Sequence, residues 1–287
     1  MPLPSDADCS GKSASANNLA ALEQLRVQAS LRLSVHQQEG CTRLLDLAEG
    51  GGYRIKFPSV APYQAMDAVI VNTGGGLLGA DSFAMTVDVG AGAALMVTTQ
   101  SAEKVYRTIQ EASRVKIELS LQNAATLHWM PQECILFDGA ALKRQIYATM
   151  AQDSTLLIAE SMTFGRLAMG EIMGAGLFKD RWRIKRGENL VFADDFSLDG
   201  AIATKLDHPA SGGGARAMAT LLLLAPDAEA RLEPIREIIR QDAVESGASA
   251  WNGMLLVRMM AADPALVRTA MIRTLTQIRG LPAPRSW

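Results

Sequence analysis

Residues 83–89 read Phe-Ala-Met-Thr-Val-Asp-Val, and this stretch decides the fold class. Phe83, Met85, Val87 and Val89 alternate with small or polar residues. Successive side chains of a β-strand point to opposite faces, so this alternation predicts a strand with one face on a core and the other facing water or a neighbour.

The same period of two recurs on both sides of this stretch. It is found in residues 31–35, 53–57 and 115–121. Shorter apolar segments bounded by Gly, Asn, Asp or Pro predict further strands. These segments are residues 68–71, 94–98, 127–130, 134–137, 156–159, 182–185, 190–193, 219–224 and 254–259.

Two stretches near the C-terminus have a helical period instead. Residues 227–245 place Leu232, Ile235, Ile238 and Ile239 on one face, with charges between them. Residues 263–278 form the second predicted helix, which Asp263 can cap and Gly280 can end. The sequence therefore predicts a mainly β fold of many short strands, with two amphipathic helices near the C-terminus.

Composition narrows the class of protein. The chain has 287 residues, 48% of them hydrophobic and 20% charged, and its formal net charge is −2. Residues 1–18 are rich in Ser, Ala, Asp and Asn, which predicts a disordered tail before a single domain over residues 19–287. No basic cluster suits a phosphate backbone, and no apolar run can span a bilayer, so neither nucleic acid nor a membrane is expected as a partner.

The three cysteines are Cys9, Cys41 and Cys134. Their odd number and wide spacing argue against a disulfide framework or a structural zinc site, which favours a reducing, cytoplasmic location. No two of the three histidines, His36, His128 and His208, have a spacing that suits a shared metal, and no serine or cysteine has a histidine near it in the sequence. The inventory therefore gives no support to a catalytic nucleophile or a tight metal site.

Residues 72–81 read Asn-Thr-Gly-Gly-Gly-Leu-Leu-Gly-Ala-Asp, directly after an apolar run. A glycine-rich loop after a strand can cradle phosphate when a helix follows it. Here another strand is predicted to follow, which favours a tight corner between two strands. A nucleotide-binding module is therefore an alternative that this loop suggests but does not favour.

Five segments, in this order, are similar to the urease accessory protein family UreD, which is called UreH in some bacteria. The similarity extends over residues 31–278. Two small-residue departures stand within it: the family usually has Gly at the position of Ala80 and Thr at the position of Cys134. The five segments are residues 72–81, 98–107 (TTQSAEKVYR), 129–139 (WMPQECILFDG), 165–171 (GRLAMGE) and 180–187 (DRWRIKRG).

This resemblance implies a β-helix-like body of many short strands and no catalytic activity. It implies a scaffold or chaperone for nickel insertion into apo-urease, in complexes with the UreF accessory protein, the UreG GTPase and the urease subunits. It also suggests an internal, water-filled passage for nickel. Because the chain has few imidazole and thiolate groups, we expect nickel to bind only transiently. No tightly bound cofactor is expected.

Acidic residues beside glycines or at strand ends are the candidates to line this passage. They are Asp81, Glu133, Asp138, Glu160 and Glu171. Buried acids need cationic partners to remain charged. The residues expected to pair with them are Lys104, Arg107, Arg166 and Arg181.

Two further expectations concern function. The main alternative to a urease accessory role is a β-helix-type carbohydrate-active enzyme, but such enzymes use aromatic platforms and only 5% of this chain is aromatic. Residues 231–287 contain eight arginines and five acids, which suggests that the C-terminal helical region docks the UreF partner.

Overall fold

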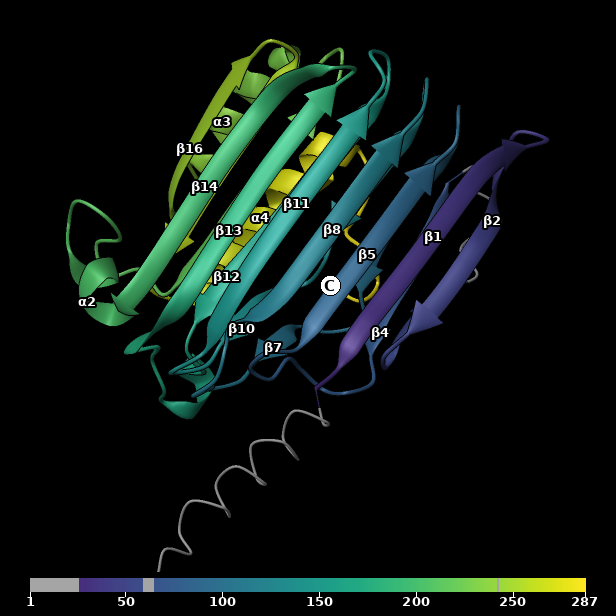
Figure 1. The fold of residues 1–287 in the computed structure, drawn as a ribbon. Helices are drawn as coiled ribbons and strands as arrows, with labels where there is room; N and C mark the ends of the chain where they lie inside the picture. Colours follow the sequence, from purple (N-terminus) through teal and green to yellow (C-terminus); the bar gives the residue numbers. More distant parts are fainter. Residues whose placement is uncertain (1–25, 59–64, 242) are drawn as a thin grey trace, which may run out of the picture.

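The computed structural model describes residues 26–58, 65–241 and 243–287 (Figure 1). The tail expected over residues 1–18 lies outside this part of the chain, and the single domain over residues 19–287 stays a prediction. No helix in the described part is long and apolar enough to cross a membrane.

The first of two sheets has seven strands in the order β14-β13-β11-β8-β5-β1-β2. Its strands are β1 (Gln28–Gln38), β2 (Cys41–Gly50), β5 (Ser82–Val89), β8 (Ser113–Leu121), β11 (Ala141–Met150), β13 (Ala175–Arg186) and β14 (Asn189–Ala201).

The second sheet has the order β16-β17-β15-β12-β9-β6-β4-β3, with β10 pairing both β12 and β7 beside this path. Its strands are β3 (Tyr53–Lys56), β4 (Met66–Asn72), β6 (Ala94–Thr99), β7 (Glu103–Val105), β9 (Thr126–Met130), β10 (Cys134–Leu136), β12 (Thr155–Phe164), β15 (Ala217–Leu224), β16 (Glu245–Trp251) and β17 (Met254–Ala261).

The chain moves back and forth between the sheets from β4 to β13. Within the first sheet, β5, β8, β11 and β13 pair in parallel, and within the second, β4, β6, β9 and β12 do the same. Each coil of chain thus adds one strand to each sheet and stacks on the coil before it. This solenoid-like arrangement confirms the expected β-helix-like, mainly β fold.

The two predicted helical regions are α3 (Leu232–Ile239) and α4 (Pro264–Arg279), which pack on the outer face of the second sheet (Figure 1). In α4, the Asp263 side chain caps the first turn by accepting a hydrogen bond from Ala265 N, and Gly280 ends the helix in a left-handed conformation. Helix α3 is shorter than predicted. The short 3-10 helix Glu229–Arg231 precedes it, and β16 already occupies Glu245.

In the described part of the chain, four strands, one α-helix and the 3-10 helix Leu167–Met169 were not predicted from the sequence. Strand β2 lies at a sheet edge with most side chains exposed, so it lacks an alternating apolar pattern. Strand β11 has Arg144 in the middle of its buried face, which interrupts the pattern. Strands β7 and β16 are short or rich in small residues. Helix α2 (Ile202–Asp207) has six residues, too few to show a helical period.

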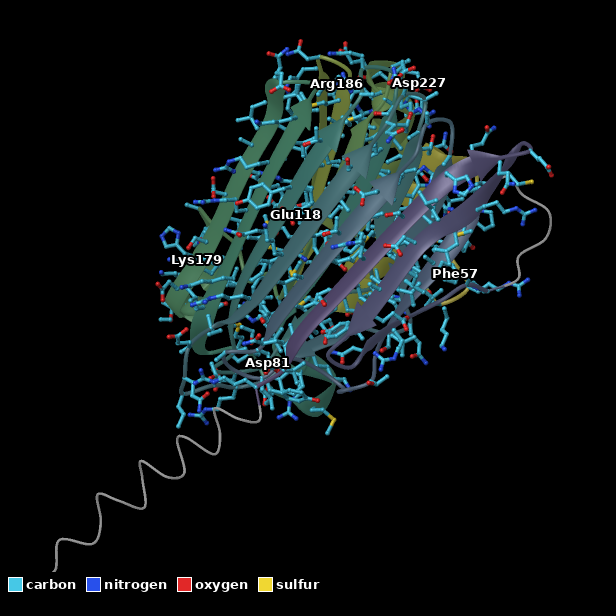
Figure 2. All side chains as sticks on the ribbon, turned by 45° about the vertical axis from the view of Figure 1, so that its right-hand side comes forward. Phe57, Asp81, Glu118, Lys179, Arg186 and Asp227 are labelled. Carbon is cyan, nitrogen blue, oxygen red and sulfur yellow. The ribbon has the colours of Figure 1, made fainter. Side chains whose placement is uncertain are left out.

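The glycine-rich segment forms the corner between β4 and β5, and no helix follows it. A Cβ atom at Gly76 would lie 2.7 Å from the Lys104 carbonyl oxygen, so the close approach of two coils requires glycine there. Ala80 has a φ of +67°, a backbone conformation that favours glycine. Asp81, at the base of the molecule in Figure 2, closes the corner by accepting hydrogen bonds from Val27 N and Leu78 N.

Apolar side chains fill the space between the sheets in two separate clusters. The larger cluster contains Ile146 of β11, Ile158 of β12 and Trp182 of β13. The smaller cluster contains Leu142 of β11, Met162 of β12 and Phe178 of β13. The same three strands therefore run through both cores, with one inward-facing position on each strand between them.

Candidate functional site: a polar layer between two apolar cores

The inward-facing positions between the two cores carry charged residues. On the inward face of β11, Arg144 is the position between Leu142 and Ile146. Its register partner on the neighbouring strand β13 is Asp180. Glu160 projects toward them from β12 in the opposite sheet. A polar layer therefore crosses the interior between two apolar layers.

Arg144 joins the two acids. Its Nε and Nη2 donate to the two carboxylate oxygens of Asp180 at 2.9 and 2.6 Å, and its Nη1 donates to Glu160. Indole N–H groups complete the layer: Trp129 donates to Glu160 at 2.7 Å and Trp182 donates to Asp180 at 2.9 Å. Each buried oxygen with a charge thus has a donor, as burial of ionised groups requires.

Burial controls the ionisation of this layer. It raises the pKa of Glu160, and this effect outweighs the opposing influence of Arg144 and the Trp129 N–H group. Burial lowers the pKa of Arg144, but Asp180 and Glu160 raise that pKa further, so the guanidinium remains charged. The layer therefore holds a permanent positive charge between two carboxyl groups in a low-dielectric interior.

Two cavities meet at this layer. The first has a volume of about 140 Å³ and extends toward the β6–β7–β10 side of the molecule. The second has a volume of about 490 Å³ and extends between the free edges formed by β14 and β16. Among the described residues, Arg144 and Glu160 alone line both cavities.

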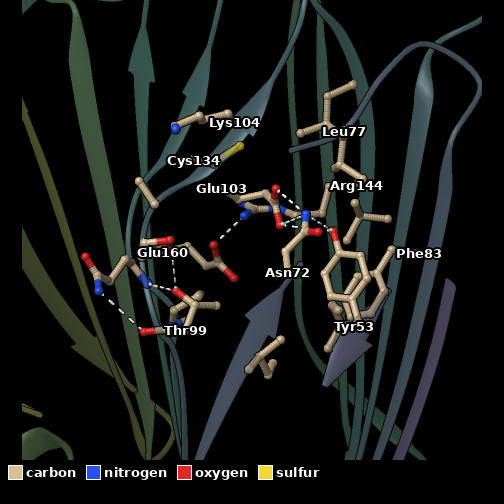
Figure 3. A pocket seen from close by; sticks show the side chains of 18 of the residues that line it. Tyr53, Asn72, Leu77, Phe83, Thr99, Glu103, Lys104, Cys134, Arg144 and Glu160 are labelled. Atoms are coloured by element: carbon tan, nitrogen blue, oxygen red, sulfur yellow. Dashed lines mark hydrogen bonds and ion pairs between the residues drawn. The ribbon is translucent and has the colours of Figure 1, made fainter. Parts of the chain in front are cut away.

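The first cavity contains a second, partly buried acid, Glu103, shown in Figure 3 beside Asn72 and Tyr53. Asn72 Nδ2 donates to the Glu103 carboxylate at 2.9 Å, and the Tyr53 hydroxyl donates to it at 3.0 Å. Burial raises the pKa of Glu103 despite these hydrogen bonds. Lys104 and Cys134 line the same cavity, and burial also raises the pKa of the Cys134 thiol.

The second cavity has an acidic rim with an ion pair across its mouth. Arg258 of β17 pairs with Asp194 of β14 at 2.6 Å, so it joins the two sheets as the inner pair Arg144–Glu160 does. Glu160, Thr220, Arg258 and Gly247 occupy successive register positions across the second sheet. Gly247 on the edge strand β16 thus lies at the same level as Glu160.

Of the five acids expected to line a passage, Glu160 lies where the two cavities meet. Glu133 pairs with Arg268 at 2.8 Å and lines a separate cavity of about 250 Å³ beside the C-terminal Trp287. Asp81 closes the glycine corner. Asp138 accepts a hydrogen bond from Ala175 N, and Glu171 accepts one from Asp138 N, within the neighbouring surface loops.

The four cations expected as partners are placed differently. Arg166 pairs with Glu171 at 2.5 Å, and this contact lowers the pKa of the partly exposed Glu171 carboxyl. Arg181 pairs with Asp195 on the surface of the first sheet. Neither Lys104 nor Arg107 forms an ion pair with any residue in the described part of the chain.

Sequence reasoning missed Arg144, Asp180 and Glu103. One signal could have found the first of these. In β11, Leu142, Ile146, Ala148 and Met150 are inward-facing at a spacing of two, and Arg144 occupies the same face. A charged residue at an inward position of an alternating strand must have buried partners. The identity of those partners depends on the parallel register, which the sequence does not display.

No group of three or more His, Cys, Asp and Glu side chains in the described part of the chain is arranged to hold a metal ion. His128 faces Arg279, whose Nε donates to His128 Nδ1 at 3.3 Å. Burial and the charges of Arg279 and Arg231 lower the pKa of His128 to about 4. His128 is thus held neutral as a structural acceptor.

This geometry predicts acid destabilisation. Because the folded-state pKa is lowered, the stabilisation is fully present above pH 6.5 and is lost as pH falls toward 4. Between pH 6.5 and pH 4 we expect the free energy of unfolding to fall by about 2 kcal/mol more in the wild type than in His128→Gln. The value is reduced for solvent screening because His128 is partly exposed. Urea denaturation at several pH values measures the difference, with exposed His208→Gln as the control. Parallel pH profiles for wild type and His128→Gln would contradict the assignment.

The comparisons with known proteins identify the family of this chain. The family model for the UreD urease accessory protein matches residues 27–287. A UreD protein of Methylobacterium sp. (strain 4-46) is 46% identical over 253 residues, covering 86% of this chain and 89% of that protein. A UreD 2 protein of Methylorubrum populi is 48% identical, with 87% and 84% covered. A UreD protein of Xanthobacter autotrophicus is 43% identical, with 93% and 91% covered.

The fold and the site thus define a β-solenoid protein whose interior is crossed by a polar layer. The match extends over nearly all of the described chain and over most of each relative. The chain belongs to the UreD urease accessory protein family.

Proposed function

We propose that this chain is a non-catalytic scaffold and chaperone for nickel insertion into apo-urease, and that nickel crosses it through the two central cavities. It acts in the cytoplasm with the UreF accessory protein, the UreG GTPase and the urease subunits. The observation that carries the proposal is the meeting of two cavities at Arg144 and Glu160, inside a member of the urease accessory family.

The chemistry of the cavities supports transport better than storage. The partly buried Glu103 lies in the first cavity, the buried Glu160 lies at the junction, and further acidic residues line the second cavity. Carboxylates attract a divalent cation in a low-dielectric channel, because the surrounding walls focus the field. The described part of the chain contains no cluster of imidazole and thiolate ligands, so nickel meets no high-affinity site there that would slow its release.

The C-terminal helices remain the proposed docking region for UreF. Several of their arginines are engaged within the chain: Arg231 with Asp227, Arg236 with Glu233, and Arg268 with Glu133. Helices α3 and α4 also cover a core formed with β15 and β17. A partner would therefore contact the exposed outer surface of helices that already stabilise the fold.

The proposal is tested by co-expressing urease subunits with UreF and UreG homologues, with and without this chain. We expect urease purified from cells containing the chain to carry nickel and to retain the chain and UreF in a pull-down. We expect urease from cells without it to contain little nickel. Equal nickel content in the two preparations would refute the proposal.

A further inference from the structure

The pair Arg144–Glu160 separates the two central cavities. These two side chains line both spaces, and their exposed fractions are 7% and 5%. Figure 3 shows Arg144 and Glu160 pointing toward each other across the interior. The pair therefore forms the boundary that the two cavities share.

Arg144 is held unequally by its two acids. It binds Asp180, its neighbour within the first sheet, through both Nε and Nη2 at 2.9 and 2.6 Å. It contacts Glu160, which belongs to the opposite sheet, through Nη1 alone. A bidentate guanidinium–carboxylate pair is the stronger and more directional arrangement. The contact that crosses between the sheets is therefore the one that can break while Arg144 stays anchored.

Charge determines what can break it. Glu160 and Asp180 supply two negative charges and Arg144 supplies one positive charge. The guanidinium does not lose its proton in proteins. Burial raises the pKa of Glu160, so a proton can also neutralise its carboxylate. At a pH where Glu160 is ionised, its carboxylate is freed from Arg144 when another cation binds it. A divalent ion offers this carboxylate twice the charge that Arg144 does, whereas a monovalent ion offers no such advantage.

We propose that the Arg144–Glu160 pair is the closed state of a gate in the passage. An entering divalent cation opens it by binding the Glu160 carboxylate, while Arg144 remains on Asp180. Arg144 is thus a tethered counter-ion that admits divalent cations in preference to monovalent ones. This inference rests on the proposed function, because it assigns a role to a pair of residues within that passage.

The first test is a titration of the purified full chain with NiCl₂, without urease. The double variant R144Q/D180N keeps the net charge of the layer at −1 and leaves Glu160 without its guanidinium partner. We expect it to bind Ni²⁺ at least about tenfold more tightly than the wild type, which corresponds to about 1.4 kcal/mol. Adding Glu160→Gln to this variant should abolish the gain.

The matched control is R258Q/D194N, which removes an arginine–aspartate pair that joins the two sheets elsewhere in the second cavity. It leaves Glu160 with Arg144, so the gate predicts no gain in Ni²⁺ affinity. Wild-type affinity in a folded R144Q/D180N protein, or an equal gain in the control, would overturn the gate.

A second measurement does not depend on the stability of the double variant. Trp129 donates to Glu160, so Ni²⁺ bound at that carboxylate should quench Trp129 fluorescence in the wild type. The Trp129-dependent quenching is the part of the Ni²⁺-induced quenching that is lost in Trp129→Phe. We expect Glu160→Gln to reduce this part at least about threefold. Equal quenching in wild type and Glu160→Gln would overturn the gate. Neither measurement involves urease, so failure of the proposed function would be seen separately, as equal nickel loading with and without the chain.

Discussion

Gly165→Ala is expected to lower the free energy of unfolding by about 4 kcal/mol, a large part of the stability of a typical domain. Gly165 follows β12 and has a φ of +111°. A Cβ atom there would lie 2.5 Å from the Glu171 carbonyl oxygen and 2.6 Å from the Ile172 Cα. Both are backbone atoms, which cannot rotate away as a side chain could. Hydrogen bonds from Gly165 N to Leu136 O and from Met173 N to Phe164 O fix the loop.

Gly170→Ala is the matched control in the same loop. Gly170 also has a positive φ, +73°, but no atom lies within 4 Å of a Cβ at that position. We therefore expect Gly170→Ala to lower the free energy of unfolding by about 1 kcal/mol, which is the effect of the backbone conformation alone. Urea denaturation of the two purified variants separates strain from crowding. Equal losses in the two proteins would contradict the close packing of this loop against β12.

The sequence predicts the class of fold because most strands have one buried face. In β5 and in residues 115–121 of β8 the inward side chains are apolar at every second position, and these strands lie where the alternation predicts. The pattern does not extend to β2, whose side chains are largely exposed at the edge of a sheet. It also cannot show that β5 pairs with β8 in parallel, because pairing depends on residues far apart in the chain.

The candidate site was predictable in part. Glu160 is a charged residue in an otherwise apolar segment, and it lies at the junction of the cavities. Arg144 and Asp180 carry no local signal of their association, since 36 residues separate them and the parallel pairing of β11 with β13 brings them together. Asp81 and Asp138 lie beside glycines as expected, yet their oxygens accept backbone hydrogen bonds that hold the loops. An acid beside a glycine or at a strand end can therefore lie at a corner of the solenoid, as Asp81 and Asp138 do, or in its interior, as Glu160 does.

Gly247→Trp is expected to remove most of the nickel from co-expressed urease without unfolding this chain. Gly247 lines the second cavity, and no atom lies within 4 Å of a Cβ built there. Its neighbour Ala248 packs toward the helices, so a side chain at position 247 points to the opposite face, toward the cavity. An indole at this mouth, at the level of Glu160, would fill the approach to the gate.

Ser249→Trp supplies the matched control, because residue 249 lies two positions further along the same edge strand and does not line the second cavity. Both variants add the same side chain to the same face of β16. Both should keep a wild-type melting temperature within a few degrees and bind UreF normally. A loss of stability or of UreF binding confined to Gly247→Trp would assign its effect to folding or assembly instead.

The most direct test of the passage is the nickel content of urease purified from cells in which wild type, Gly247→Trp or Ser249→Trp is the sole copy of this chain. Nickel transport through the two cavities predicts full loading with wild type and Ser249→Trp, and severely reduced loading with Gly247→Trp. Full loading with a folded, UreF-bound Gly247→Trp protein would contradict it.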